Sequence, residues 1–293
     1  MQTHLTIASL RAALDAERDA GKRIAFVPTM GNLHEGHITL MRRAINHGEC
    51  IVGSIFVNRM QFGPKDDFDR YPRTFEADCA KLVEAGVHHL FAPDEQQLYP
   101  SPQKFVVEPD PFLQTTLEGE FRPGHFHGVA TVVLKLFNIV QPHAALFGKK
   151  DYQQYLVLSA MVRELNLRVQ VLPGDTVRAA DGLALSSRNG YLSEAERAEA
   201  PRLYRLLGAM REKILAGSCD YDALQAEAMA ELAAHGWAPQ YVAVRRRSDL
   251  KSPTALDTGL VILAAAFLGT TRLIDNLEAV SYTHLTLPTN REV

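Results

Sequence analysis

The feature of this sequence that most constrains its fold is the alternation of short apolar runs with longer segments of helical periodicity. Residues 24–27 and 50–57 are runs rich in β-forming side chains, typical of buried strands. Between them, Ile38, Met41 and Ile45 recur on one face of a predicted helix. A strand, a helix and a further strand of these lengths predict a βαβ crossover, and therefore a parallel sheet covered on both faces.

The alternation continues through the first half of the chain. Helical periodicity is found over residues 74–85, 128–140 and 151–165, and strand-like runs cover residues 88–93, 144–148 and 167–173. We therefore expect a Rossmann-like α/β domain over residues 1–176.

The sequence changes character after residue 176. Residues 181–196 are rich in loop-forming residues, and Ser193 with Glu196 forms a capping box that opens a helical stretch. A predicted helix at 222–234 precedes two predicted strands at 241–245 and 260–269, so we expect a smaller α+β domain over residues 177–280. Residues 281–293 follow neither period, and we expect them to be a non-native tail.

Composition excludes several classes of protein. The 31 Lys and Arg residues against 34 Asp and Glu residues give a net charge of −3, which does not suit general binding to nucleic acid. Hydrophobic residues at 46% and charged residues at 22% are typical of a globular chain. The most apolar run, 260–268, is too short to span a membrane, and the N-terminus has no signal-peptide pattern. We expect a cytoplasmic protein that binds neither nucleic acid nor membranes.

The cysteines agree with that location. Cys50, Cys79 and Cys219 are widely separated, and none of them forms a pair at zinc or redox spacing. Their odd number favours a reducing compartment, and we expect all three to be buried thiols.

The segment PTMGNLHEGH, residues 28–37, is the most informative in the chain. It follows a predicted strand and opens a helix, whose free N–H groups and partial positive charge suit a phosphate. His34 and His37, at HxGH spacing, can donate hydrogen bonds to phosphates and stabilise the charge of in-line phosphoryl chemistry. A surface histidine pair beside a glycine turn is the alternative. Zinc is less favoured, because HExxH sites need wider spacing and no third ligand is near.

Polar side chains follow two other predicted strands. Asn58 and Gln61 come after the run 50–57, and Lys149, Lys150 and Gln154 come after the run 144–148. Ligands bind at the carboxyl ends of strands in open α/β sheets. The amides suit a neutral, hydroxylated substrate and the lysines suit a phosphate, although solvated loop residues would give the same pattern.

Two further segments carry candidate binding groups. LSSRNG places Ser186 and Ser187 beside Arg188, whose guanidinium can hold a phosphate with two hydrogen bonds, although the segment also suits a simple turn or helix cap. RPGHFHG contains His125 and His127 and suits either a substrate-pocket loop or a metal site.

Seven segments taken together carry a family resemblance. In order they are PTMGNLHEGH, SIFVNRMQF, YPRT, RPGHFHGV, FGKKDYQQ, DGLALSSRNGYL and TRLIDN. This set resembles the pantothenate synthetases, which are pantoate–β-alanine ligases, and the resemblance covers residues 7–279. It implies a Rossmann-like domain of the HxGH nucleotidyltransferase type, a smaller C-terminal lid domain and a homodimer.

The resemblance also implies a reaction of coenzyme A biosynthesis that uses ATP and Mg²⁺. The pantoate carboxylate attacks the α-phosphate of ATP and releases pyrophosphate, and the β-alanine amine then attacks the pantoyl adenylate and expels AMP. Adenylation gives the carboxyl group a good leaving group, and a closed site shields the intermediate from water. Another HxGH nucleotidyltransferase and a non-catalytic nucleotide-binding module are the alternatives. The paired amides of Gln61 and Gln154 argue against a phosphorylated acceptor, which would call for more cationic groups.

By matching position, the resemblance assigns catalysis to His34, His37, Lys150 and Arg188, with His37 as proton donor. It places Asp151 at the ribose and Val177 near the adenine. The residues implied to bind ATP are Met30, Gly31, Asn32, Leu33, His34, Glu35, Gly36, His37, Gly148, Lys149, Lys150, Asp151, Val177, Leu185, Ser186, Ser187 and Arg188. Those implied to bind pantoate or β-alanine are Asn58, Gln61 and Gln154.

Two positions depart from the family pattern. Arg59 stands where the family usually has proline, and Lys149 stands where it usually has an acid. Both changes add positive charge at the expected rim of the site, and neither removes a residue assigned to catalysis. The sequence does not identify metal ligands.

Overall fold

The computed structural model describes residues 1–64 and 66–280, so the predicted tail lies outside the described residues. A six-stranded, all-parallel sheet in the order β1-β4-β3-β2-β5-β6 forms the centre of the first part. Its strands are β1 (Gln2–His4), β2 (Ile24–Thr29), β3 (Cys50–Ile55), β4 (His89–Phe91), β5 (Ala144–Gly148) and β6 (Gln170–Gly174). The predicted α/β class with a parallel sheet is confirmed.

Helices cover both faces of this sheet. Buried side chains of α1 (Ile7–Asp19), α7 (His125–Val140) and α8 (Tyr152–Glu164) pack on one face. Those of α2 (Glu35–Ala44) and α3 (Phe75–Glu84) pack on the other. The remaining elements are short: η1 (Arg59–Gln61), η2 (Phe68–Arg70), α4 (Glu95–Leu98), α5 (Pro111–Thr115), α6 (Glu118–Phe121), η3 (Lys149–Asp151) and η4 (Ser187–Tyr191).

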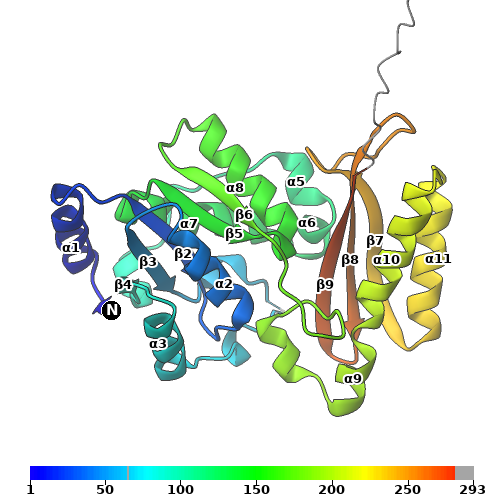
Figure 1. Cartoon of the computed structure of the whole chain (residues 1–293), viewed down its shortest axis with the longest axis horizontal. Coiled ribbons are helices and arrows are strands. Elements are labelled where there is room, and N and C mark those ends of the chain that lie inside the picture. The colour runs from blue at the N-terminus through cyan, green and yellow to red at the C-terminus, as the bar shows by residue number, and fades with distance from the viewer. Residues whose placement is uncertain (65, 281–293) are drawn as a thin grey trace, which may run out of the picture.

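A smaller antiparallel sheet follows, as the predicted α+β part requires. It consists of β7 (Trp237–Arg246), β8 (Gly259–Leu268) and β9 (Thr271–Val280). Figure 1 shows α10 (Arg202–Leu215) and α11 (Tyr221–Ala234) on the side of this sheet that faces away from the parallel sheet. The short α9 (Glu194–Glu199) precedes them and begins with the predicted capping box of Ser193 and Glu196.

Strand β8 joins the two parts of the molecule through its alternating side chains. Leu260 and Ile262 pack with α10 and α11, whereas Val261 and Leu263 belong to the core beneath α7 and α8. Strand β8 is therefore buried on both faces. We propose residue 176 as the boundary between the two parts, because β6 ends just before it.

Several elements differ from the prediction. Helix α7 begins at His125, three residues before the predicted start at 128, and β1 and β9 were not predicted. Ile45, placed by its spacing on the apolar face of α2, is the C-cap of that helix and is 58% exposed.

The expectation of three buried thiols is correct for one cysteine only. Cys50 lies in β3 and is buried, whereas Cys79 is half-buried in α3 and Cys219 is exposed between α10 and α11. In the part of the chain that the structure describes, no helix combines the length and apolar composition that a bilayer span requires.

Candidate active site

A cavity of about 220 Å³ opens at the carboxyl ends of β2, β3 and β5, whereas two neighbouring pockets hold only about 10 and 20 Å³. Its wall combines the start of α2, the segment after β3, the start of α8 and the segment 185–188. The predicted site residues that line it are Met30, His34, Gly36, His37, Asn58, Gln61, Gly148, Lys150, Asp151, Gln154, Val177, Leu185, Ser186, Ser187 and Arg188.

The two histidines of the HxGH segment cap the N-terminus of α2. The backbone N–H of Gly36 donates to Nδ1 of His34 at 3.1 Å, and the N–H of His34 donates to Nδ1 of His37 at 3.3 Å. A neutral imidazole whose Nδ1 accepts a hydrogen bond carries its proton on Nε2. Each ring therefore keeps an Nε2–H donor for a ligand.

Burial keeps both rings neutral. It is the main cause that lowers the pKa of His34 to about 2, with further lowering by His37, Lys150 and Lys81. Burial also lowers the pKa of His37 to about 4, although Asp151 and Asp78 act in the opposite direction. At neutral pH both rings are therefore neutral imidazoles, each with an Nε2–H that can donate a hydrogen bond.

Gly36 is required by the position of the His34 ring. A Cβ at residue 36 would lie 2.8 Å from Cε1 and 2.9 Å from Nδ1 of His34, closer than van der Waals contact allows. The HxGH turn therefore needs glycine between the histidines for steric reasons.

Asp78 of α3 holds the turn that precedes His34, and it was not predicted from the sequence. It is fully buried, and its two carboxylate oxygens accept from the backbone N–H groups of Asn32 and Leu33, each at 2.8 Å. Lys81 donates to the carbonyl of Leu33 at 2.6 Å. Nothing in the motif spacing identifies Asp78, because the contact spans more than forty positions.

A buried amide network positions Gln61. Nδ2 of Asn58 donates to Oε1 of Gln61 and to the carbonyl of Gly128, both at 3.1 Å, and Tyr99 donates to Oδ1 of Asn58 at 2.9 Å. Asn58 therefore has protein partners on both ends of its amide. It orients Gln61, whose Nε2 donates to Sδ of Met30 at 3.3 Å.

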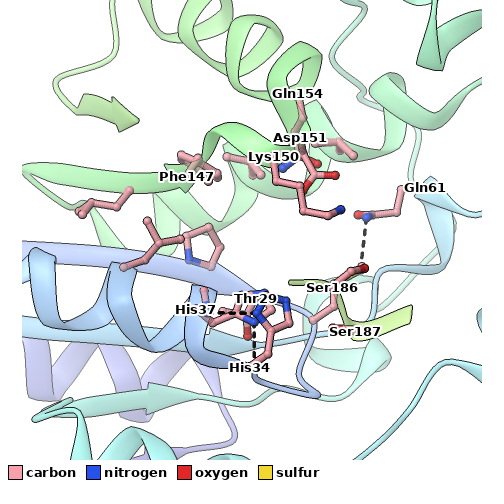
Figure 2. A pocket seen from close by; sticks show the side chains of 18 of the residues that line it. Thr29, His34, His37, Gln61, Phe147, Lys150, Asp151, Gln154, Ser186 and Ser187 are labelled. Carbon is pink, nitrogen blue, oxygen red and sulfur yellow. Dashed lines mark hydrogen bonds between the residues drawn. The ribbon is translucent and has the colours of Figure 1, made fainter. Parts of the chain in front are cut away.

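The consecutive glutamines of α8 have different surroundings. Gln154 lines the cavity, and Figure 2 shows it on the same segment as Lys150 and Asp151. Gln153 is 2% exposed and is fully engaged, donating to the carbonyls of Leu113 and Thr116 and accepting from the N–H of Glu118.

The two adjacent lysines also separate. Figure 2 shows the side chain of Lys150 extending over the cavity toward Gln61. The Lys149 ammonium instead lies 2.9 Å from a carboxylate oxygen of Asp175 and 3.6 Å from one of Glu278, and Lys149 does not line the cavity. Asn276 of β9 donates to the carbonyls of both lysines, at 2.8 and 2.9 Å, and so fixes the loop that carries them.

Arg188 lines the cavity but has a carboxylate partner. Its Nε and Nη2 donate to the two oxygens of Asp67, at 3.0 and 2.7 Å. Burial alone would lower the pKa of Arg188, but the hydrogen bonds and charge of Asp67 raise it. The planar fork is thus engaged by a carboxylate, which has the geometry and charge that a phosphate also offers.

His125 belongs to the cavity wall. Its Nδ1 lies 2.9 Å from the carbonyl of Gln61 and its Nε2 lies 3.1 Å from Nη1 of Arg122, so both ring nitrogens have protein partners. His127 faces Glu108 at 3.0 Å instead. This arrangement agrees with the pocket-loop alternative for this segment.

Four other predicted site residues do not line the cavity. Gly31 takes a positive φ of 83° and turns the chain against Asp78, and the side chain of Leu33 is buried in the core. The Asn32 amide donates to the carbonyl of Ser187, and Glu35 pairs with Arg42. They shape the turn around His34.

The comparisons with known proteins agree with this geometry. Residues 2–278 match the family described as Pantoate-beta-alanine ligase. The chain is 59% identical over 279 residues to a pantothenate synthetase from Chromobacterium violaceum, covering 95% of this chain and 99% of that protein. It is 56% identical over 272 residues to one from Nitrosospira multiformis, covering 93% and 96%.

Solved structures show the same relationship. A pantothenate synthetase from Thermus thermophilus is 46% identical with a TM-score of 0.90, covering 96% of this chain and all of that one. A pantoate-beta-alanine ligase from Francisella tularensis, in complex with beta-gamma ATP and beta-alanine, is 32% identical with a TM-score of 0.81, covering 94% and 97%. This chain therefore belongs to the pantoate-beta-alanine ligase family and is a ligase that forms a carbon–nitrogen bond.

Proposed function

We propose that the chain joins pantoate to β-alanine in two steps at this cavity, with ATP as the activating substrate and pantoyl adenylate as the intermediate. The observation that carries the proposal is that one cavity combines phosphate-binding donors with a pair of amides. His34, His37 and Lys150 supply the donors, and Gln61 and Gln154 supply the amides.

The triphosphate of ATP occupies the side of the cavity formed by the start of α2 and the segment 185–188. The N-terminus of α2 and the Nε2–H groups of the histidines favour negative charge there. Ser186, Ser187 and Arg188 approach from the other side, and Lys150 adds a positive charge over the cavity. The bound substrate competes with Asp67 for Arg188.

Pantoate is a hydroxylated acid, and neutral amides hold its hydroxyl groups without attracting a second phosphate. Gln61 is preset by Asn58, so little side-chain entropy is lost when the substrate binds. The side-chain amide of Gln154 has no hydrogen bond to another described residue and is available to a ligand.

In the first step the pantoate carboxylate attacks the α-phosphorus of ATP, and pyrophosphate leaves. The Nε2–H donors of His34 and His37 and the Lys150 ammonium stabilise the charge that builds on the phosphoryl oxygens. In the second step the β-alanine amine attacks the acyl carbon, and AMP leaves with the bonding electrons.

Mg²⁺ is the metal that the resemblance implies. The acids lining the cavity are Asp151 and Asp175; Asp175 pairs with Lys149, whereas Asp151 has no ion pair in the described part of the chain. Mg²⁺ binds through one or two carboxylates together with substrate phosphates. Asp151, which the resemblance places at the ribose, also fits as its protein ligand because its carboxylate has no ion-pair partner among the described residues. The ion would neutralise phosphate charge when bound.

The test is exchange of labelled pyrophosphate into ATP. Pantoate without β-alanine is expected to support exchange, because adenylation precedes amide formation, and excess EDTA is expected to abolish it. Exchange that strictly requires β-alanine would overturn the two-step order. Full activity in EDTA would overturn the role of Mg²⁺.

The family resemblance further leads us to propose a cytoplasmic homodimer. Sedimentation equilibrium of the purified chain tests the dimer. A monomer at micromolar concentration would contradict it.

A further inference from the structure

A second cluster of reactive side chains lies away from the active site. Glu17 of α1, Cys50 at the start of β3 and His89 at the start of β4 bring one ligand atom each to within 4.8 Å of one another. They lie near the amino ends of β3 and β4, whereas the active site lies at the carboxyl ends of the strands. Figure 1 shows α1 and β4 at the end of the molecule opposite the three-stranded sheet.

The parallel register explains how these residues meet. Val52 is the partner of His89 between β3 and β4, so Cys50 lies two residues before that partner and its side chain is on the same sheet face. Helix α1 packs on this face and brings Glu17 to it. No sequence motif predicts the cluster, because its members lie on three separate elements.

The ligand atoms have the spacing and chemistry of a zinc site. Zn²⁺ binds thiolate sulfur, imidazole nitrogen and carboxylate oxygen at about 2.0–2.3 Å, which places neighbouring ligand atoms roughly 3.3–3.6 Å apart. Nε2 of His89 and Oε1 of Glu17 are already 3.4 Å apart. Movement of about 1 Å at Cys50 or Glu17 completes the triangle.

The second polar atoms of His89 and Glu17 are each held by another side chain. Nδ1 of His89 lies 3.0 Å from Nε2 of His4, which leaves Nε2 of His89 for a metal. The second oxygen of Glu17, Oε2, lies 2.6 Å from the ammonium of Lys22. Partners of this kind orient metal-bound histidines and carboxylates in known sites.

We propose that Glu17, Cys50 and His89 bind a zinc ion, with His4 and Lys22 orienting the ligands. The thiol proton leaves to solvent as the zinc–sulfur bond forms. The thiolate and the carboxylate together balance the charge of the ion. The three side chains supply three ligand atoms, and the fourth position takes water, which can enter beside Glu17 because 21% of its side chain is exposed.

The test uses Co²⁺ as a spectroscopic substitute for Zn²⁺ in the full chain without nucleotide. We expect one equivalent of Co²⁺ to give a sulfur-to-cobalt charge-transfer band, and one equivalent of Zn²⁺ to remove it. The double variant Cys79→Ser/Cys219→Ser retains Cys50 as the only cysteine of the three and should keep the band. Cys50→Ser should lose it.

Two further variants test the site without replacing Cys50. Glu17→Gln changes the partly exposed ligand, and His4→Phe removes the hydrogen-bond partner of His89. Both should weaken Co²⁺ binding, His4→Phe by about 10–100-fold. Pyrophosphate exchange by each variant reports that the fold is intact. No thiolate band in the wild type, a band that survives in Cys50→Ser, or unchanged affinity in folded Glu17→Gln would overturn the proposal.

Discussion

His34 and His37 are neutral donors, and this property determines what their removal does. In the proposed mechanism each Nε2–H stabilises phosphoryl charge through a hydrogen bond, so we expect His34→Ala and His37→Ala each to lower kcat by about 10²–10³-fold. Steady-state kinetics measures the loss, and circular dichroism establishes that the variants are folded. Near wild-type turnover in both folded variants would leave the histidines without a catalytic role.

The neighbouring lysines allow a comparison within one loop. Lys150 extends over the cavity, whereas Lys149 pairs with Asp175 and Glu278. Removing a close phosphate contact costs more than removing a partly solvated ion pair, which contributes about 0–1 kcal/mol. We therefore expect Lys150→Ala to abolish most pyrophosphate exchange and Lys149→Gln to retain most of it. The reverse order would mean that the phosphate-binding lysine is Lys149.

At the scale of the element, helix α2 has a glycine in its first turn, at position 36, although glycine is a poor helix former. Alanine is the better helix former, by about 1 kcal/mol over glycine, yet a Cβ at Gly36 collides with the His34 ring. We expect Gly36→Ala to keep thermal stability and to lose at least tenfold in kcat. Gly208→Ala in α10 is the matched control, since a Cβ there meets no atom within 4 Å. Equal kcat in the two variants would contradict the steric argument.

The elements also show how far the sequence reaches. Strongly periodic or apolar segments such as β3, β5 and β8 were predicted because burial determines both their composition and their structure. Strand β1 has three residues, too few to show a period, and β9 alternates less regularly because Asp275 and Asn276 are buried polar residues. Helix α7 was predicted to begin at Gly128. In the structure its N-cap is Gly124, which has the left-handed conformation, so the helix begins three residues earlier.

The residues of the candidate site likewise fall into a group that was predicted from the sequence and a group that was not. His34, His37, Gln61 and Lys150 were predicted because each follows a strand or opens a helix. Asp78 and Tyr99 were not, because their roles depend on contacts with residues more than forty positions away. Local patterns identify the groups proposed to meet the ligand, whereas tertiary packing determines the groups that hold them in place.

At the scale of the whole molecule, buried histidines set the response of stability to acid. Burial lowers the pKa of His34 to about 2, and of His37 and His125 to about 4. Below about pH 6.5, the pKa of histidine in the unfolded chain, the unfolded chain binds protons at these histidines and the folded chain does not, so acid favours unfolding. From about pH 6.5 to 4.5, each such histidine lowers the free energy of unfolding by about 2 kcal/mol. We therefore expect the Tm, measured by circular dichroism, to fall as the pH is lowered from about 6.5 to 4.5. A Tm that stays constant over this range would contradict the role of the buried histidines.

The two parts of the molecule are joined by an ion pair that is largely shielded from solvent, with 17% of the Arg272 side chain and 12% of the Glu118 side chain exposed. Arg272 of β9 donates to both oxygens of Glu118, at 2.8 and 2.7 Å, and although burial raises the pKa of Glu118, Arg272 lowers it to about 2. Arg272→Ala leaves that carboxylate unpaired, and we expect a loss of about 3–5 kcal/mol in unfolding free energy. Arg246→Ala removes a more exposed pair with Asp249 and is expected to cost about 0–1 kcal/mol in denaturant titration. Equal losses would place the Glu118 pair among the weak surface pairs.

Asn276 has a consequence for protein engineering. Its side-chain amide, on the last strand of the small sheet, donates to the carbonyls of Lys149 and Lys150. A chimera that exchanges residues 177–280 with those of a relative also exchanges the support of a lysine that the first half contributes. Recombination between family members should therefore succeed only where the incoming strand carries an equivalent amide in the same register. A crossover at residue 176, although simplest by sequence, can therefore change the position of Lys150.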